Sequence, residues 1–589
     1  MMIPGGVFVN SKEGAAAMLD ILIKRGKVVD GTGAPARVAD VAVKGGRIVG
    51  AGDLPDAEAA RTIDASGKIV SPGFIDIHTH NDLYVIRDDY VELFEPYIRQ
   101  GITTSVVSNC GWSVAPWLPE NGELFHSTLQ TMGISKDFEP QWETVKEFNQ
   151  WLLGRGLPIN FVPLSAHGPL RVAAMGDNAR FSTDAELARM KELLRKDMED
   201  GCRGFSTGLT YFPGMYAHTD EIVELAGVSQ EYGGRYVTHI RSLTNTYARA
   251  VEEAVEIARR SGSSLQVSHF MAVPDLGRMG DIFYELVGVL EKVNKVVPLP
   301  GLPNAQLKKG YGVVDQALAE GLDVGLDFIP YVMGNTTVTQ LYPPWALMGG
   351  TEALLRRLAD PAERARIRHD VETVKDKWPQ WEPGSWATNY LKCLSYKMLS
   401  ILSIGSEKNS YMEGKRVVDL AREAGKDNFD FLADLAIEEE GAVVFIMGIP
   451  PKAWSEKVFL HGQDHPQLSV GADVLFPERG AAPQTAYGTF PRIFDHYVKE
   501  LGFFTLENAV HRCTAMAASR YGLADRGVLR EGAMADITVF DFESIRDNST
   551  YENAQQNPSG IEYVLVNGKV VLEKGTYHSG ALAGEVLSR

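Results

Sequence analysis

Eight short apolar runs, separated by helical patterns, most constrain what this chain can fold into. Such an alternation is typical of βαβ units and a parallel sheet, and eight strands close a (β/α)8 TIM barrel. An open doubly wound sheet is the alternative, but the glycine-rich dinucleotide turn that would support it is missing after the first run. The runs are IVSPGFIDIHTH (69–80), TTSVVSNC (103–110), INFVPLSAHG (159–168), CRGFSTGL (202–209), RYVTHI (235–240), LQVSHF (265–270), LDVGLDFIPY (322–331) and LSVGADV (468–474).

The two ends of the chain have a different sequence pattern from its middle. Short strand-like stretches separated by turn-forming residues occupy residues 18–67, and the same pattern is found at 527–578. We predict that these two segments pair into one small β-sandwich domain beside a barrel that spans 68–526. Residues 1–17 lack a basic start and a sustained apolar stretch, so we interpret them as a flexible leader.

A long gap separates the seventh run from the eighth. It covers about 332–467, which is far too long for an ordinary barrel connection. The gap contains helical stretches of its own, such as TEALLRRLADPAERARIRHDVETV. An insertion at the C-terminal end of barrel strands lies over the mouth, where barrel active sites are found. We therefore predict a helical lid.

Composition narrows the possible partners. The 58 Lys and Arg residues against 76 Asp and Glu residues give a net charge of −18 without a basic stripe, which argues against nucleic acid and anionic membranes. The apolar runs are far shorter than the roughly 20 residues of a membrane span. The four cysteines show no paired spacing, so we predict a cytoplasmic enzyme without disulfides. A homo-oligomer is compatible with this interpretation.

Candidate metal ligands stand at the C-terminal ends of five runs. His78 and His80 face the same way, because strand side chains alternate with period two. Taken singly, each candidate has an ordinary explanation as a buried, polar-face or turn residue. A barrel brings these ends together at one mouth, however, so the whole set predicts a metal site. The candidates are His78, His80, Cys110, His239, His269 and Asp473.

The ligand types indicate which metal binds. Imidazole and thiolate suit Zn²⁺ and disfavour Mg²⁺ or Ca²⁺, whereas Fe, Co and Ni remain compatible with this argument. Four histidines, one thiolate and one carboxylate could serve two ions if Cys110 bridges them. We predict Zn²⁺ as the cofactor, and a catalytic ion keeps one position for water.

Several motifs carry a resemblance to a known family. They include PGFIDIHTHND, SNCGWSVAP, GFSTGLTYFPGMYAHTDEI, GRYVTHIRS, QVSHF, GTFPR and LADRGVLREGAMADITVFD. Together they resemble the amidohydrolase superfamily, specifically its D-aminoacylase (N-acyl-D-amino-acid deacylase) branch, from about residue 18 to 575. Cys110 is distinctive, because many relatives use instead a carbamylated Lys on the fourth strand, and the fourth run here has no Lys.

The resemblance implies roles for the candidate ligands. It implies a tightly held zinc on Cys110, His239 and His269, and a weaker second site on His78, His80, Cys110 and Asp473. Zinc lowers the pKa of bound water to about 7 and polarises an amide carbonyl. Asp473 would act as general base and then as general acid. Tyr211 and Tyr331 stand in motifs whose tyrosines contact the substrate, although aromatic packing explains them equally well.

Two departures from the family pattern concern substrate recognition. Gln484 follows Pro483 where the family has an Arg that clamps the substrate carboxylate, and Leu243 replaces an acidic residue. Arg479, in the same loop as Gln484, is a candidate substitute for the missing Arg. We therefore expect a small-molecule amide with an apolar portion and no carboxylate held in the family manner.

We predict from this sequence a zinc-dependent hydrolase that cleaves the C–N bond of an N-acyl amine or N-acyl amino-acid-like compound. Hydrolysis of a cyclic amide, an ester or a carbamate-type bond is an alternative, since one metal-dependent apparatus serves many carbonyl substrates on such a fold. A non-catalytic barrel scaffold is a further alternative. A scaffold that had lost its chemistry would be expected to have lost some metal-ligating residues, whereas all six candidates are present.

Overall fold

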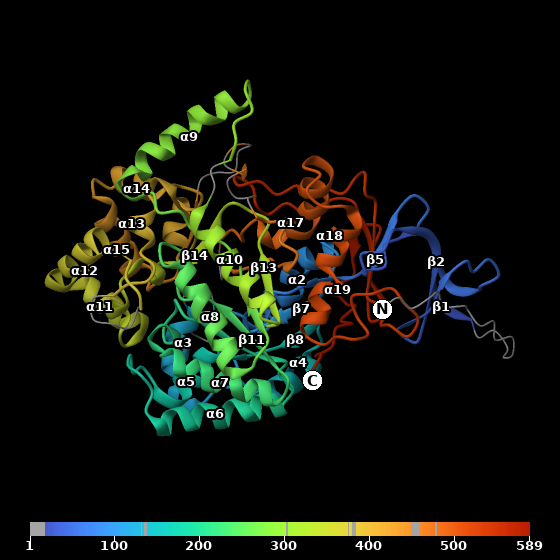
Figure 1. Ribbon diagram of the computed structural model, residues 1–589, viewed down its shortest axis with the longest axis horizontal. Helices are drawn as coiled ribbons and strands as arrows, with labels where there is room; N and C mark the ends of the chain where they lie inside the picture. The colour runs from blue at the N-terminus through green and yellow to red at the C-terminus, as the bar shows by residue number, and fades with distance from the viewer. Residues whose placement is uncertain are drawn as a thin grey trace.

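The computed structural model describes residues 18–589 except 131, 133, 135–137, 302–303, 375, 380–384, 449–453, 455, 458–459, 461 and 478–479. The leader predicted at 1–17 therefore lies outside the described residues. In Figure 1 the first strands of the chain form one end of the molecule, the helices α11 to α15 form the opposite end, and the barrel lies between them.

Parallel strands form the barrel that the sequence predicts, which confirms the α/β barrel part of the predicted fold class. The third strand is interrupted and consists of β8 and β9, and the ring closes where Ile77 N donates to Val470 O at 3.5 Å. The strands, in order around the barrel, are β6 (Phe74–Asp76), β7 (Ile102–Val107), β8 (Asn160–Pro163), β9 (Ser165–Ala166), β10 (Gly204–Gly208), β11 (Arg235–His239), β12 (Leu265–Val267), β13 (Val324–Phe328) and β17 (Leu468–Val470).

Helices pack around the outside of the barrel. The strands are therefore buried on both faces, as in other parallel sheets. In β7, for example, all six residues are buried. Thr144 and Thr183 start α4 and α6 with capping boxes, which satisfy the first backbone N–H groups. The helices that follow barrel strands are α1 (Asn81–Tyr84), α2 (Tyr90–Arg99), α3 (Gly122–Gln130), α4 (Val145–Arg155), α5 (His167–Met175), α6 (Asp184–Glu199), α7 (Thr219–Glu231), α8 (Tyr247–Ser261), α9 (Gly280–Asn294), α10 (Ala305–Ala319), α17 (Thr485–Arg492), α18 (Leu506–Cys513) and α19 (Ala515–Arg520).

The two chain ends pair in one nine-stranded sheet. Its hydrogen-bonded order is β21-β20-β19-β18-β5-β1-β2-β3, and β4 pairs with β1. Strand β5 joins the two ends, because it pairs with β1 on one side and with β18 on the other. The first residues of the run 69–80 thus belong to this sheet. Its strands are β1 (Leu19–Val28), β2 (Arg37–Lys44), β3 (Arg47–Gly52), β4 (Ala59–Asp64), β5 (Ile69–Pro72), β18 (Ile537–Phe540), β19 (Ile561–Val566), β20 (Lys569–Glu573) and β21 (Thr576–Tyr577).

The segment between β13 and β17 packs around a second hydrophobic core, to which the loop after β10 contributes Phe212, Met215 and Tyr216. It contains a small antiparallel sheet in addition to the helices that the sequence indicates, with the order β14-β16-β15. Leu354, Phe431 and Leu432 are buried in its core. The elements are β14 (Gly334–Thr337), α11 (Gly350–Ala359), α12 (Pro361–Thr373), α13 (Tyr390–Cys393), β15 (Leu399–Ile404), α14 (Val417–Glu423), α15 (Asn428–Glu438) and β16 (Val443–Met447).

The last residues of the chain return to the barrel. Gly584 N donates to Leu157 O at 2.7 Å, and Phe161 N donates to Glu585 O at 2.8 Å. The C-terminal tail therefore packs beside β8, and Asn567 Nδ2, between β19 and β20 of the terminal sheet, also donates to Ala583 O at 2.8 Å. Among the described residues, no helix combines the length and the apolar character that crossing a membrane requires.

Candidate metal centre

All six candidate ligands lie at the carboxyl ends of barrel strands. Cys110 occupies the centre of the group: its Sγ lies 3.2 Å from His78 Nε2, 3.8 Å from His239 Nδ1 and 3.8 Å from His269 Nε2. The cysteine side chain is buried. One sulfur atom therefore contacts imidazoles that come from three different strand ends.

Asp473 completes the group from the end of β17. Its Oδ1 lies 3.4 Å from His78 Nε2 and 3.2 Å from His80 Nε2. The carboxylate is 20% exposed, whereas the rings of His78 and His80 are 0% and 3% exposed. Asp473 is thus the member of the cluster that small molecules at the mouth can reach most easily.

Three of the candidate ligands have an unusual backbone conformation. The φ angles of Cys110, His269 and Asp473 are 53°, 32° and 47°. Residues with a side chain rarely adopt positive φ, at a cost of about 1–3 kcal/mol each, and such strain gathers at functional sites. The backbone is therefore strained at the three positions whose side chains meet in the cluster.

A buried carboxylate that the sequence analysis did not single out supports two of the ligands. Asp327, on β13, accepts a hydrogen bond from the backbone N of His269 at 2.6 Å, and its Oδ1 lies 3.2 Å from His78 Nδ1. Gln266 Nε2 donates to its other oxygen at 3.1 Å. The sequence offered one sign of this role, an acidic residue inside the apolar run LDVGLDF. Burial of an unpaired charge in a barrel strand has a high free-energy cost, so such a residue is expected to have a partner.

The electrostatics of the cluster favour the metal-binding protonation state of two ligands, Cys110 and His239. Burial alone would raise the pKa of the Cys110 thiol, but the charge of His78 and hydrogen bonds from His239 and His269 hold it well below its ordinary value. Burial and the neighbouring His269 lower the pKa of His239 to about 4. Metals bind thiolate and neutral imidazole, so these two groups are prepared as ligands.

The donor set fits a transition metal. Thiolate, imidazole and carboxylate are the zinc ligands of proteins. In addition, His80 Nδ1, His239 Nε2 and His269 Nδ1 are buried without a hydrogen-bond partner among the described residues. These nitrogens are opposite to the ones that face Cys110 Sγ and Asp473 Oδ1, so the nitrogens that point into the cluster are the ones available to a metal.

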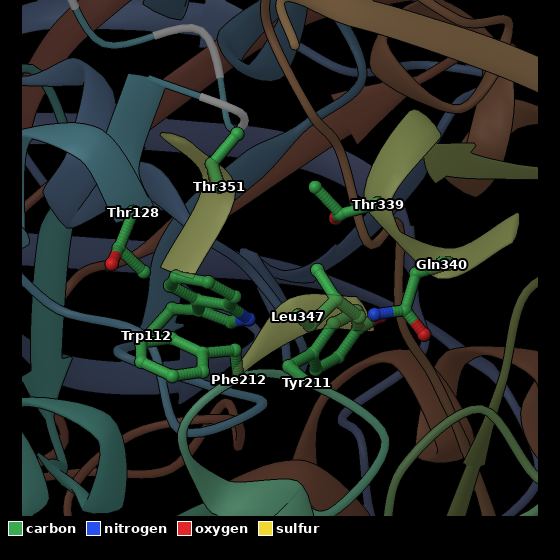
Figure 2. Close-up of a pocket in the computed structure, with 8 residues that line it drawn as sticks. All are labelled: Trp112, Thr128, Tyr211, Phe212, Thr339, Gln340, Leu347 and Thr351. Atoms are coloured by element: carbon green, nitrogen blue, oxygen red, sulfur yellow. The ribbon is translucent and has the colours of Figure 1, made fainter. Parts of the chain in front are cut away.

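Tyr211 lies directly beside the cluster. Its ring packs edge-on against His239 with a centroid distance of 4.7 Å, and against Trp112 at 5.6 Å. Figure 2 shows both aromatic side chains in a small pocket, together with Thr339 and Leu347 from the segment between β13 and β17. Tyr211 is therefore placed between a candidate ligand and the insertion.

The structure describes three of the other substrate-binding candidates, Tyr331, Gln484 and Leu243. The Tyr331 hydroxyl donates to Asp547 Oδ2 at 2.8 Å, and Gln484 Nε2 donates to Ser549 O at 3.3 Å, so both side chains meet one C-terminal loop. Leu243 is buried. Arg479 lies outside the described residues.

An apolar cavity of about 420 Å³ opens beside the mouth. The loops after β11 and β12 border it and are joined where Val273 N donates to Leu243 O at 2.6 Å. No Lys, Arg or His is found among the described residues that line it. The large apolar side chains of the lining are Met271, Leu276, Phe283, Leu307, Val332, Leu394, Met398, Met447 and Trp454.

Comparisons with known proteins agree with this geometry. A model of the Amidohydrolase family matches residues 61–377 and 476–572. A D-aminoacylase from Alcaligenes xylosoxydans xylosoxydans is 31% identical over 572 residues, which are 97% of this chain and 98% of the relative. An N-acyl-D-glutamate deacylase from the same organism is 32% identical and covers 94% and 93%.

Solved structures of deacylases are also similar to this chain. An N-acyl-D-glutamate deacylase from Bordetella bronchiseptica, complexed with zinc and a phosphonate inhibitor, matches with a TM-score of 0.74 at 30% identity. The match covers 97% of this chain and 100% of the other. A D-aminoacylase structure matches with a TM-score of 0.73 at 29% identity, with the same coverage.

Proposed function

The chain belongs to the amidohydrolase family, and we propose that it is a zinc-dependent hydrolase that cleaves the amide C–N bond of an N-acyl amine or N-acyl amino-acid-like small molecule. The observation that carries this proposal is the contact of Cys110 Sγ with three imidazoles at the barrel mouth. One relative is a D-aminoacylase and another an N-acyl-D-glutamate deacylase, which supports an amide as the bond cleaved.

Cys110, His239 and His269 are the proposed ligands of a tight zinc site. His78, His80, Cys110 and Asp473 are the proposed ligands of a weaker second site. The geometry supports a shared cysteine, because Cys110 belongs to two groups of candidate ligands whose atoms lie within 4.8 Å of one another. Zinc bound there would supply Lewis acidity, which polarises an amide carbonyl and makes water more acidic.

Asp473 is the proposed general base and general acid. Burial would raise its pKa, but the charge of His78 and a hydrogen bond from His80 hold the pKa well below its ordinary value, so the carboxylate is ionised at neutral pH. It takes a proton from the attacking water as the oxygen of that water bonds to the carbonyl carbon. It then gives this proton to the amide nitrogen as the C–N bond breaks, which releases an acid and an amine.

The proposed substrate has an apolar portion and no α-carboxylate clamped by an arginine. Gln484 is neutral, and its amide already donates to Ser549 O. The 420 Å³ cavity supports this specificity, because most of its large side chains are apolar and three of them are methionines, which adapt to ligand shape. Polar side chains also line the cavity, namely Asn245, Asp275, Asn304, Gln306 and Gln463, and the Gln463 Oε1 is buried without a partner among the described residues.

The test is release of amine from matched substrates by the zinc-loaded full chain. We expect hydrolysis that a chelator abolishes, and faster hydrolysis of a bulky N-acyl-D-amino carboxamide than of the corresponding free acid. Absence of chelator-sensitive hydrolysis across N-acyl amines, N-acyl amino acids and their carboxamides would contradict the reaction. A strong preference for the free acid, lost in Arg479→Ala, would leave the reaction intact and overturn the specificity.

A further inference from the structure

Helix α9 carries an uncovered apolar face. Ile282, Leu286, Val289 and Val293 are 65%, 45%, 54% and 41% exposed. Their spacing of four, three and four residues places them on one stripe of the helix. In Figure 1 this helix lies at the outer edge of the molecule, away from the barrel.

The opposite face of α9 is the one that anchors it to the rest of the chain. Val287 is buried, and Phe283 lines the apolar cavity. The Glu291 carboxylate accepts the backbone N–H of Trp454 at 3.0 and 3.1 Å. The exposed stripe is therefore a second apolar surface of the helix, separate from the surface that its own chain covers.

The stripe continues beyond the helix. Val296 and Val297 are 82% and 57% exposed. Monomeric soluble proteins rarely expose a contiguous apolar patch of this kind, and larger ones mark interaction sites. A short helix also draws most of its stability from packing. Both considerations favour a partner on this face.

The charges beside the stripe indicate which partner. Asp281 and Glu285 lie in the first half of α9, whereas Lys292 lies near its end and Lys295 follows it. In an antiparallel pair of identical helices, Glu285 meets Lys292 of the partner subunit and Asp281 meets Lys295 of the partner subunit. The second pair centres on Gly288 and the first between Gly288 and Val289, and an added Cβ on Gly288 would meet no atom within 4 Å.

We propose that α9 is the contact between two copies of this chain, packed antiparallel about a two-fold axis beside Gly288. Such an isologous contact uses the same patch on both subunits. Glu285 already pairs with Lys397 at 2.8 Å, but it is 70% exposed and has room for a second cation. A lipid surface is the less favoured occupant, because the chain carries a net charge of −18.

Sedimentation velocity of the full chain over a concentration series tests this proposal. We expect a dimer whose dissociation constant rises on the order of a hundredfold or more in Leu286→Asp, since two apolar contacts are lost per dimer. Leu153→Asp is the matched control, because Leu153 is a 56% exposed leucine on α4, and it should leave the dimer intact.

Charge reversal separates a specific contact from a folding defect. Lys292→Glu alone should weaken the dimer, and Glu285→Lys combined with Lys292→Glu should restore it. A wild-type chain that stays monomeric at every concentration would overturn the proposal, as would a dimer that Leu286→Asp leaves unchanged. Leu286-dependent binding of a monomer to phosphatidylcholine vesicles would assign the face to lipid instead.

Discussion

Asp327 and His78 form a buried pair at the base of the metal cluster: Oδ1 lies 3.2 Å from Nδ1, and the two side chains are 1% and 0% exposed. This contact holds a proton on Nδ1 of His78. The other ring nitrogen, Nε2, lies 3.2 Å from Cys110 Sγ and is the one that a bound metal would take. A carboxylate behind a histidine orients it as a metal ligand and raises its basicity.

Asp327→Asn should weaken metal binding while the chain stays folded. The amide keeps the size of the side chain but lacks the charge that holds the His78 ring, and loss of such support typically costs 10–100-fold in affinity. Metal titration monitored by calorimetry measures the change. Asp184→Asn, at an exposed position in the first turn of α6, is the control and should have no effect. Equal affinities in wild type and Asp327→Asn would show that the carboxylate is only structural.

Asp473→Asn should lower turnover with most of the metal retained. The amide cannot accept a proton, so kcat should fall by roughly 10²- to 10⁴-fold, the range for lost general acid–base catalysis. Steady-state kinetics with metal analysis of the same samples separates the two effects. Nearly normal turnover would show that Asp473 does not transfer the proton.

The size of the cavity should set acyl specificity. Ala305 lines it at the start of α10, so Ala305→Trp should fill part of it. We expect kcat/KM for a bulky apolar acyl amide to fall tenfold to a hundredfold, with little change for an N-acetyl amide. Ala319→Trp, at the exposed end of the same helix, is the matched control. Equal losses for both substrates would place the acyl group elsewhere.

Glu221 should make stability depend on pH in acid. Burial would raise its pKa, but a hydrogen bond from His167 and the charge of Arg171 lower it from 4.5 to about 2. Because the folded pKa is depressed, its contribution is complete above about 4.5 and is lost as the pH falls toward about 2. The contribution is on the order of 3 kcal/mol.

Urea denaturation of wild type and Glu221→Gln measures this contribution. Glu221→Gln should be less stable at neutral pH, and the difference should shrink as the pH falls through that window. Glu224→Gln, at a 52% exposed position on the same helix, should behave like wild type. A difference that stays constant with pH would contradict the assignment.

Much of the site followed from the positions of residues relative to strands. Period-two alternation placed His78 and His80 together, and their rings are 5.7 Å apart. Cys110 and Asp473 could be predicted to lie near these histidines because parallel strands bring their carboxyl ends to one mouth, and both lie beside His78. These inferences needed only local periodicity and barrel topology.

The remaining features depend on contacts that no local pattern encodes. Asp327 acts through the backbone N of His269, a residue with φ of 32°, so its role appears only once the strands are assembled. The sequence pattern predicts that β5 is part of the first barrel strand, whereas in the structure β5 pairs with β1 and β18 of the terminal sheet. Trp454 reaches the cavity from the segment between β13 and β17, where sequence distance says little about position.

Zinc K-edge X-ray absorption on the purified, zinc-loaded chain tests the central claim most directly. We predict one sulfur ligand at about 2.3 Å with nitrogen ligands at about 2.0–2.1 Å. In Cys110→Ala the sulfur contribution should vanish together with most of the metal and the turnover, whereas Cys393→Ala should change little. A spectrum without sulfur, or full metal occupancy in Cys110→Ala, would contradict the account.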